Sequence, residues 1–310
     1  MANRPLAEII TEMIDADRVC LPVHPELLVE VTASIADGRV GSSLFWALVA
    51  DDPSLICRLV RAANSSFYAG LPKALSIDEA VTRLGLDKAV RIVEEACRSS
   101  NGPIQGELLS RYMPSLWQHA QGCATGARWR AWRCGYLAIA DQAQCAGLLH
   151  NIGKRVLLAA MQTAASDGDL ETELPEALVL EVISTTHVEQ GLRLFDEWSL
   201  PEVYKTLVSE YHTEEPDIQN TIVALVKLAN TGCRKIGLGL EKSPDIVLPT
   251  TGEAQFLGID EIALAEFEIM LEDSFLWGGA VTPGNMFDCS NSAQAMSFRL
   301  YFGRFFAKLL

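Results

Sequence analysis

Apolar residues recur along most of this chain at intervals of three and four, the spacing that places side chains on one face of an α-helix. No stretch alternates with the two-residue period of a half-buried β-strand. The pattern therefore predicts an all-α fold of about fifteen helices. The main predicted helices cover residues 5–17, 26–36, 42–49, 53–63, 76–84 and 87–96, then a run from Ser115 onward, 145–161, 175–189, 202–212, 221–230 and 293–310.

Several helix ends carry recognisable signals. Asp52-Pro53 has an N-cap residue followed by proline at the first helical position. Ser76 with Glu79 matches a capping box, and Gly85 is expected to separate two helices. Asn64 is interpreted as structural, either as a helix C-cap or as a hydrogen-bonding group between subdomains.

The polar run Arg98–Gly102 is the best candidate for an internal boundary. We therefore expect an N-terminal helix over 1–17, a main domain over 18–275, and a tail over 276–310. The main domain is expected to contain two packed helical subdomains, 18–100 and 115–275. The tail ends in a Phe-rich segment, for which a helix docked on the body is preferred over a dimer helix or a membrane-surface helix.

Composition narrows the functional classes. The chain has 310 residues, of which 49% are hydrophobic and 21% charged, as in globular proteins. A net charge of −15 argues against nucleic acid as a partner. The eight cysteines form no CxxC pair, which indicates reduced thiols and a cytoplasmic protein. We expect no signal peptide and no membrane span, because the N-terminus is acidic and no apolar run reaches about 18 residues.

The most informative stretch is Cys145–Met161, in which His150-Asn151 interrupts an apolar helical pattern. Each buried polar group needs a partner, so another group must receive these two side chains. Four of the five histidines lie in the second half of the chain, His119, His150, His187 and His212, and Asn230 is a further polar residue in an apolar helix. Imidazole is a common metal ligand, but a lone buried histidine is more often a hydrogen-bonded core residue. The long, irregular spacings leave open whether these residues converge.

Two other features carry less weight. Arg128, Arg130 and Arg133 form a small basic cluster among tryptophans. The cluster could contact an anion or an acidic partner surface, although a half-exposed helix with extended arginines is the preferred interpretation. Lys154 could contact a phosphate, but a solvated lysine at a helix end is preferred.

The order His119, His150-Asn151, His187, His212, Asn230 resembles the HD superfamily of metal-dependent phosphohydrolases, with both aspartate positions replaced by asparagine. Further motifs resemble the HDOD family, the HD-related output domain of bacterial signalling proteins, over about residues 18–275. These motifs are Leu21-Pro22, Asp52–Leu55, Arg61–Ser65, Phe67-Tyr68, Ala80–Gly85, Trp117–His119, Gly147–Lys154, Trp198–Pro201 and Leu238-Gly239.

This resemblance implies an all-helical protein in bacterial signal transduction that works by binding partners. The implied partners are histidine kinases, receiver domains or cyclic-dinucleotide enzymes of a two-component or second-messenger pathway. The groove between the subdomains and the Phe-rich tail are the expected contact surfaces, and a homodimer is left open.

The resemblance also implies a degenerate metal site. Catalytic sites of this type use carboxylates to stabilise the metal charge and to hold an activated water, whereas asparagine is a neutral amide. We therefore expect no enzymatic activity and no cofactor. If a divalent metal binds, the expected ligands are His119, His150, His187 and His212. The alternatives are a metal or ligand sensor, and a residual phosphohydrolase that recruits an acidic residue such as Glu189 or Asp141.

Overall fold

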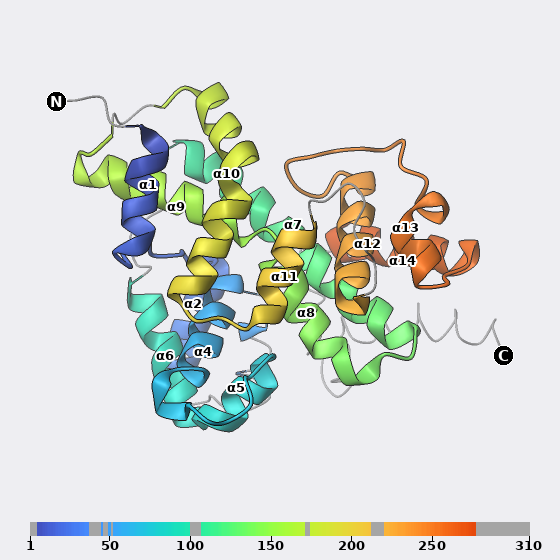
Figure 1. The fold of residues 1–310 in the computed structure, drawn as a ribbon, viewed down its shortest axis with the longest axis horizontal. Helices are drawn as coiled ribbons and strands as arrows, with labels where there is room; N and C mark the ends of the chain where they lie inside the picture. Colours follow the sequence, from blue (N-terminus) through green and yellow to red (C-terminus); the bar gives the residue numbers. More distant parts are fainter. Residues whose placement is uncertain are drawn as a thin grey trace.

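The computed structural model describes residues 5–36, 45, 49–50, 52–99, 107–170, 174–211 and 220–276, and every regular element in these ranges is a helix (Figure 1). The all-α prediction is confirmed. The first group of helices is α1 (Leu6–Asp15), α2 (Pro25–Ala36), α4 (Pro53–Ala63), α5 (Ile77–Leu84) and α6 (Leu86–Ser99). The second group is α7 (Glu107–Arg133), α8 (Ala140–Leu149), α9 (Ile152–Asp167), α10 (Glu176–Glu197), α11 (Glu202–Tyr211), α12 (Thr221–Ile236), α13 (Gly252–Phe256) and α14 (Glu261–Leu276). Short 3-10 turns cover Ser66–Tyr68, Leu137–Ile139 and Leu248–Thr250.

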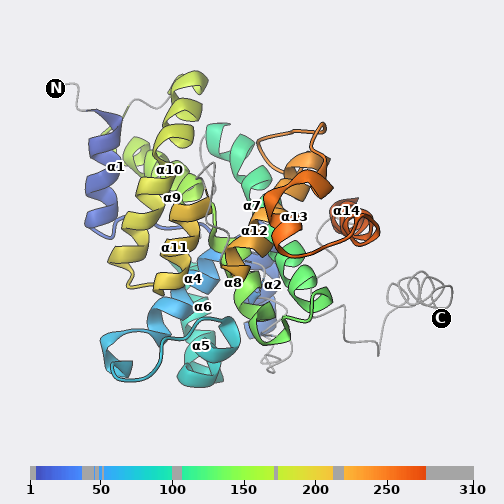
Figure 2. The same ribbon diagram turned by 45° about the vertical axis from the view of Figure 1, so that its right-hand side comes forward.

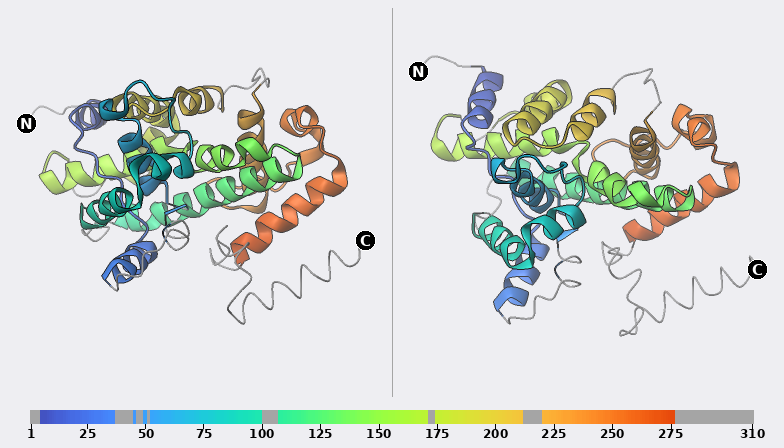
Figure 3. Two further views of the ribbon diagram at one scale, coloured as in Figure 1. Left: turned by 90° about the horizontal axis from the view of Figure 1, so that it is seen from below. Right: turned by 60° about the horizontal axis from the view of Figure 1, so that its bottom comes forward.

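The long helix α7 connects the two ends of the molecule. It packs against α8 and α9, and α12 and α14 also lie against it. Helices α4, α5 and α6 form one end, and α12, α13 and α14 lie at the other (Figures 1 and 2). Figure 3 shows the same arrangement from below, with α14 at the end opposite α2. No helix among the described residues is long and apolar enough to cross a membrane.

Helix α1 packs on α9 and α10, which lie far from it in the sequence. Its apolar face is buried there, through Ile9, Ile10, Met13 and Ile14. At the polar edge of this contact, Arg193 of α10 forms an ion pair of 3.0 Å with Asp15. The start of the chain is thus fastened to its second half.

The predicted helix-end signals are confirmed. The Asp52 carboxylate caps α4 by accepting hydrogen bonds from the backbone N–H groups of Ser54, at 2.8 Å, and Leu55, at 3.0 Å. It also accepts one from the N–H of His24, at 2.9 Å. Ser76 caps α5 by accepting from the N–H of Glu79, at 3.2 Å.

Asn64 is a structural residue, as expected. It is the C-cap of α4, and its side-chain amide exchanges two hydrogen bonds with the backbone of Ala74. The amide nitrogen donates to the Ala74 carbonyl at 3.0 Å, and the amide oxygen accepts from the Ala74 N–H at 2.8 Å. Because Ala74 lies in the same half of the chain, the bond holds a loop to α4 and does not join the two halves.

Four predicted boundaries were wrong, one of them the end of α10, which continues past Glu189 to Glu197. The predicted continuous helix through His150-Asn151 is broken there, since α8 ends at Leu149 and α9 begins at Ile152. Helix α7 begins at Glu107 rather than Ser115 and contains Pro114, a residue that usually ends a helix pattern. Helix α12 continues past Asn230 to Ile236. In the last case the side chain of Asn230 is buried and bonds to His119, and this contact outweighs the weak helix propensity of asparagine.

Some predictions lie partly or wholly outside the described residues. They concern most of the helix expected over 42–49, part of the boundary at 98–102, His212, and the tail after residue 276. The division of the main domain into two subdomains stays a prediction.

Candidate functional site

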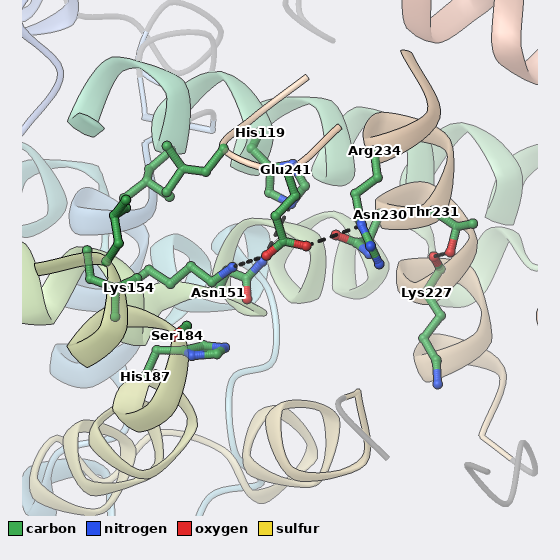
Figure 4. A pocket seen from close by; sticks show the side chains of 14 residues that line it. His119, Asn151, Lys154, Ser184, His187, Lys227, Asn230, Thr231, Arg234 and Glu241 are labelled. Atoms are coloured by element: carbon green, nitrogen blue, oxygen red, sulfur yellow. Dashed lines mark hydrogen bonds and ion pairs between the residues drawn. The ribbon is translucent and has the colours of Figure 1, made fainter. Parts of the chain in front are cut away.

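A cavity of about 660 Å³ opens between α7, α9, α10, α12 and the segment after α12. Ten of the fourteen residues that line it are polar or charged, and Figure 4 labels these ten. The polar lining residues are His119, Asn151, Lys154, Ser184, His187, Lys227, Asn230, Thr231, Arg234 and Glu241. The cavity is therefore a candidate binding site for a polar or charged ligand.

The structure brings together most of the residues that the sequence singled out. His119 from α7, Asn151 before α9, His187 from α10 and Asn230 from α12 all line the cavity. His150 lies directly behind them, with its ring centroid 5.3 Å from that of His119. The convergence that the irregular spacing left open is thus observed for five of the six positions, and His212 lies outside the described residues.

Two glycines make this convergence possible. A Cβ atom on Gly147 would lie 2.6 Å from Cα of Ala124, so α8 touches the backbone of α7. A Cβ atom on Gly153 would lie only 1.8 Å from the backbone oxygen of His187, so α9 touches the backbone of α10. These two close approaches set the distances between the helices that carry His119, Asn151 and His187.

The backbone fixes the protonation pattern of two imidazoles. Nδ1 of His119 lies 2.8 Å from the carbonyl oxygen of Leu238, and Nδ1 of His150 lies 2.7 Å from that of Gly147. A carbonyl oxygen only accepts hydrogen bonds, so each Nδ1 carries the proton of the neutral ring. Both Nε2 atoms are consequently acceptors.

Asn151 supplies the donor that these acceptors need. Its amide nitrogen lies 2.8 Å from Nε2 of His150 and 3.5 Å from Nε2 of His119. The first distance is an ordinary hydrogen bond, and the second is a long contact. An aspartate here would place an oxygen lone pair against the nitrogen lone pairs. The amide oxygen of Asn151 is buried and has no hydrogen-bond partner among the described residues.

The cavity holds neutral imidazoles and a charged cluster in which three cations, Lys154, Lys227 and Arg234, outnumber one carboxylate, Glu241. Burial lowers the pKa of His119 and of His187, and the positive charge of Lys154 lowers both further. Glu241 lies between two cations, 3.2 Å from Nζ of Lys154 and 3.3 Å from Nε of Arg234 (Figure 4). Burial favours a higher pKa for Glu241, but these cations hold it below its usual range.

The acidic residues considered from the sequence do not line the cavity. Glu189 is exposed and lies 4.0 Å from Arg193, and Asp141 pairs with Arg128 at 2.8 Å. Glu241 is instead the one carboxylate among the described lining residues. The sequence offered no signal for it, because it belongs to an irregular segment that reaches the cavity only through the packing of α12 on α7.

The basic residues have different surroundings. The preferred interpretation of Lys154 as a solvated lysine was wrong, because its side chain lines the cavity and is largely buried beside Glu241. Arg128, Arg130 and Arg133 lie elsewhere on α7. Arg130 is buried and donates to the carbonyl of Ala263, and Arg133 pairs with Glu266 at 2.6 Å. Both thus hold α14 on α7.

The lowered pKa values of His119 and His187 predict a loss of stability in acid. The unfolded chain binds protons at histidine below about pH 6.5, whereas the folded chain resists protonation until a lower pH. The stabilisation is therefore complete above pH 6.5 and is lost as the pH falls. Between pH 7.5 and 5.5 we expect the free energy of unfolding to drop, by at most about 1.4 kcal/mol for each histidine.

Urea unfolding at the two pH values, in the presence of a chelator, measures this drop. The His187→Gln variant should show a smaller drop than the original chain. An equal drop in both would remove His187 from the explanation.

Comparison with known proteins agrees with the family resemblance of the sequence motifs. The family model of the HDOD domain matches residues 21–214. An uncharacterized protein of Treponema pallidum (strain Nichols) is 26% identical over 226 residues, which are 71% of this chain and 43% of that protein. The chain thus spans less than half the length of this relative.

Solved structures with the same fold include the MmoQ response regulator from Methylococcus capsulatus str. Bath. It has a TM-score of 0.63 and 21% identity, over 80% of this chain and 97% of that one. A virulence factor from Campylobacter jejuni subsp. jejuni has a TM-score of 0.57 and 14% identity, over 83% of this chain and 96% of that one.

Proposed function

Because the chain belongs to the HDOD domain family, we propose that it is a non-catalytic signalling module that acts through contacts with partner proteins. Its partners would be histidine kinases, receiver domains or cyclic-dinucleotide enzymes in the cytoplasm. The fold shared with the MmoQ response regulator is compatible with this role. The functional unit would be residues 18–275, with the groove between the two subdomains as one contact surface.

The amide of Asn151 is the observation that carries the non-catalytic part of the proposal. Hydrolases of the HD type hold cations between imidazoles and carboxylates, and the metal-bound water is the nucleophile. Here the amide nitrogen occupies the space beside both Nε2 atoms, and the second asparagine, Asn230, also contacts His119. Glu241, the one carboxylate among the lining residues that the structure describes, is already paired with Lys154 and Arg234. Such an arrangement lacks the negative charge that a catalytic metal centre requires.

A small-ligand sensor is the second candidate function. Within the described part of the chain, the buried amide oxygen of Asn151 beside the cavity has no hydrogen-bond partner, and an unsatisfied buried acceptor is costly. A ligand with a donor group would satisfy it. In this case ligand binding between α9, α10 and α12 would modulate the partner contact.

Metal analysis combined with an activity assay tests the proposal. The purified chain is analysed by elemental mass spectrometry before and after chelation, and is then assayed on a generic phosphodiester with added Mn²⁺ or Ni²⁺. We expect no turnover above that of the metal ion alone. Metal-dependent turnover that disappears in the His150→Ala variant would overturn the non-catalytic assignment.

A further inference from the structure

We propose that His119, Cys123 and Cys233 form a binding site for one zinc ion. Their potential ligand atoms, a ring nitrogen of the histidine and the two Sγ atoms, all lie within 4.8 Å of one another, and all three residues are buried. This inference goes beyond the proposed function, because the two thiols are not among the residues of the HD-type site. It does not depend on whether the protein contacts a partner.

The fold places the three ligands on two packed helices. His119 and Cys123 are four residues apart on α7, so they share one helix face. Cys233 is on α12, which packs against that face. Nε2 of His119 lies 3.6 Å from Sγ of Cys123. Tetrahedral zinc with ordinary Zn–N and Zn–S bonds separates such atoms by roughly 3.6 Å, so this pair needs little rearrangement.

His119 is already oriented as a metal ligand. Histidine ligands commonly donate their other ring N–H to a backbone carbonyl or a carboxylate, which fixes the tautomer and the ring. The Nδ1–H of His119 donates to Leu238 in this way, and the N–H of Leu238 is bonded to the carbonyl of Cys233 at 2.8 Å. A Cβ atom on Gly239 would lie 2.8 Å from Nδ1, so the loop covers the ring closely.

The charges of the proposed zinc complex cancel, which suits a buried site. Zn²⁺ binds two thiolates and a neutral imidazole, and two protons leave to solvent, so the complex has no net charge. A neutral complex avoids the large cost of burying an isolated charge. Burial raises the pKa of the Cys123 thiol, so without metal this thiol stays protonated and the affinity for zinc should rise with pH.

The ion has a route to the site. His119 lines the polar cavity as well as facing the two thiols. The long contact of 3.5 Å from Asn151 to His119 is weak, so it can be given up while the 2.8 Å bond to His150 remains. Bound zinc would fasten α7 to α12 beside the cavity, without a carboxylate ligand.

Zinc titration of the full chain tests this inference. The reduced, chelator-treated protein is titrated with Zn²⁺ against a chromophoric competitor, and with Co²⁺ as a spectroscopic substitute. We expect one ion per chain and a thiolate-to-cobalt charge-transfer band. The Cys123→Ala and Cys233→Ala variants should bind about 100-fold more weakly or worse, whereas Cys57→Ala, which removes a buried thiol of α4, should bind normally.

Three results would overturn the inference. They are no stoichiometric zinc on the folded chain, a cobalt complex without a thiolate band, and unchanged affinity in both cysteine variants. The band of the original chain decides the question even if a cysteine variant fails to fold. These three results concern zinc binding alone, whereas metal-dependent turnover of a phosphodiester would contradict the proposed function instead.

Discussion

Replacing Gly153 by alanine is expected to destabilise the protein by about 3 kcal/mol, near the upper end of typical overpacking costs. The added methyl group would lie 1.8 Å from the backbone oxygen of His187 and 2.7 Å from its carbonyl carbon. A backbone cannot turn aside as a flexible side chain can, so α9 and α10 would have to separate. Urea unfolding followed by circular dichroism measures the change in the free energy of unfolding.

Gly191→Ala is the matched control for this prediction. Gly191 lies on α10 opposite Gly153, but a Cβ atom there would approach Cα and N of Gly153 only to 3.4 Å, an ordinary contact. Alanine is also a better helix former than glycine, by up to about 1 kcal/mol. We therefore expect Gly191→Ala to be nearly neutral. If both variants lost the same stability, the close approach at Gly153 could not be the cause.

The Asn151→Asp variant is expected to gain affinity for Mn²⁺ of about 100-fold or more. Without metal, the carboxylate would face the lone pairs of His150 and His119, in place of the amide donor that lies 2.8 Å and 3.5 Å from them. A bound cation converts this repulsion into ligation by one carboxylate and two imidazoles. Mn²⁺ is chosen because it prefers oxygen and imidazole ligands over the thiolates of Cys123 and Cys233.

Thermal unfolding with and without Mn²⁺ measures this gain. At a concentration about 100 times the dissociation constant, binding to the folded state alone would stabilise the variant by about 2.7 kcal/mol. The original chain and the Asn151→Ala variant should respond little, because neither has the carboxylate. The explanation of Asn151 as a substitute for a cation fails if Asn151→Asp responds to Mn²⁺ no more than Asn151→Ala does.

The sequence was sufficient to predict an all-helical fold and those helix ends that are set by neighbouring residues in the chain. The capping bonds of Asp52 and Ser76 and the helix break at Gly85 involve residues within one turn, so these effects can be predicted without the fold. Pro114 and Asn230 were misleading because each favours a helix end locally, whereas packing keeps α7 and α12 continuous around them.

The candidate site was only partly predictable, because it also depends on how the helices pack. The family resemblance identified His119, His150, Asn151, His187 and Asn230, but nothing in their spacing showed that α7, α9, α10 and α12 meet. The role of the Asn151 amide depends on two carbonyl oxygens, those of Leu238 and Gly147, which no side-chain motif records. Glu241 reaches the cavity, and Cys233 comes close to His119, only through the packing of α12 on α7.

The docking of α1 on α9 and α10 affects how the chain can be made. Its apolar face remains uncovered on the ribosome until residues up to Glu197 at the end of α10 have emerged. At ordinary rates of synthesis this takes roughly 10 to 40 s after α1 itself is made. During that interval α1 of one nascent chain can pair with α9 and α10 of a neighbour whose own α1 has not yet docked. Crowded translation would therefore favour exchange of the first helix between copies, a hazard that a chaperone holding the N-terminus would suppress.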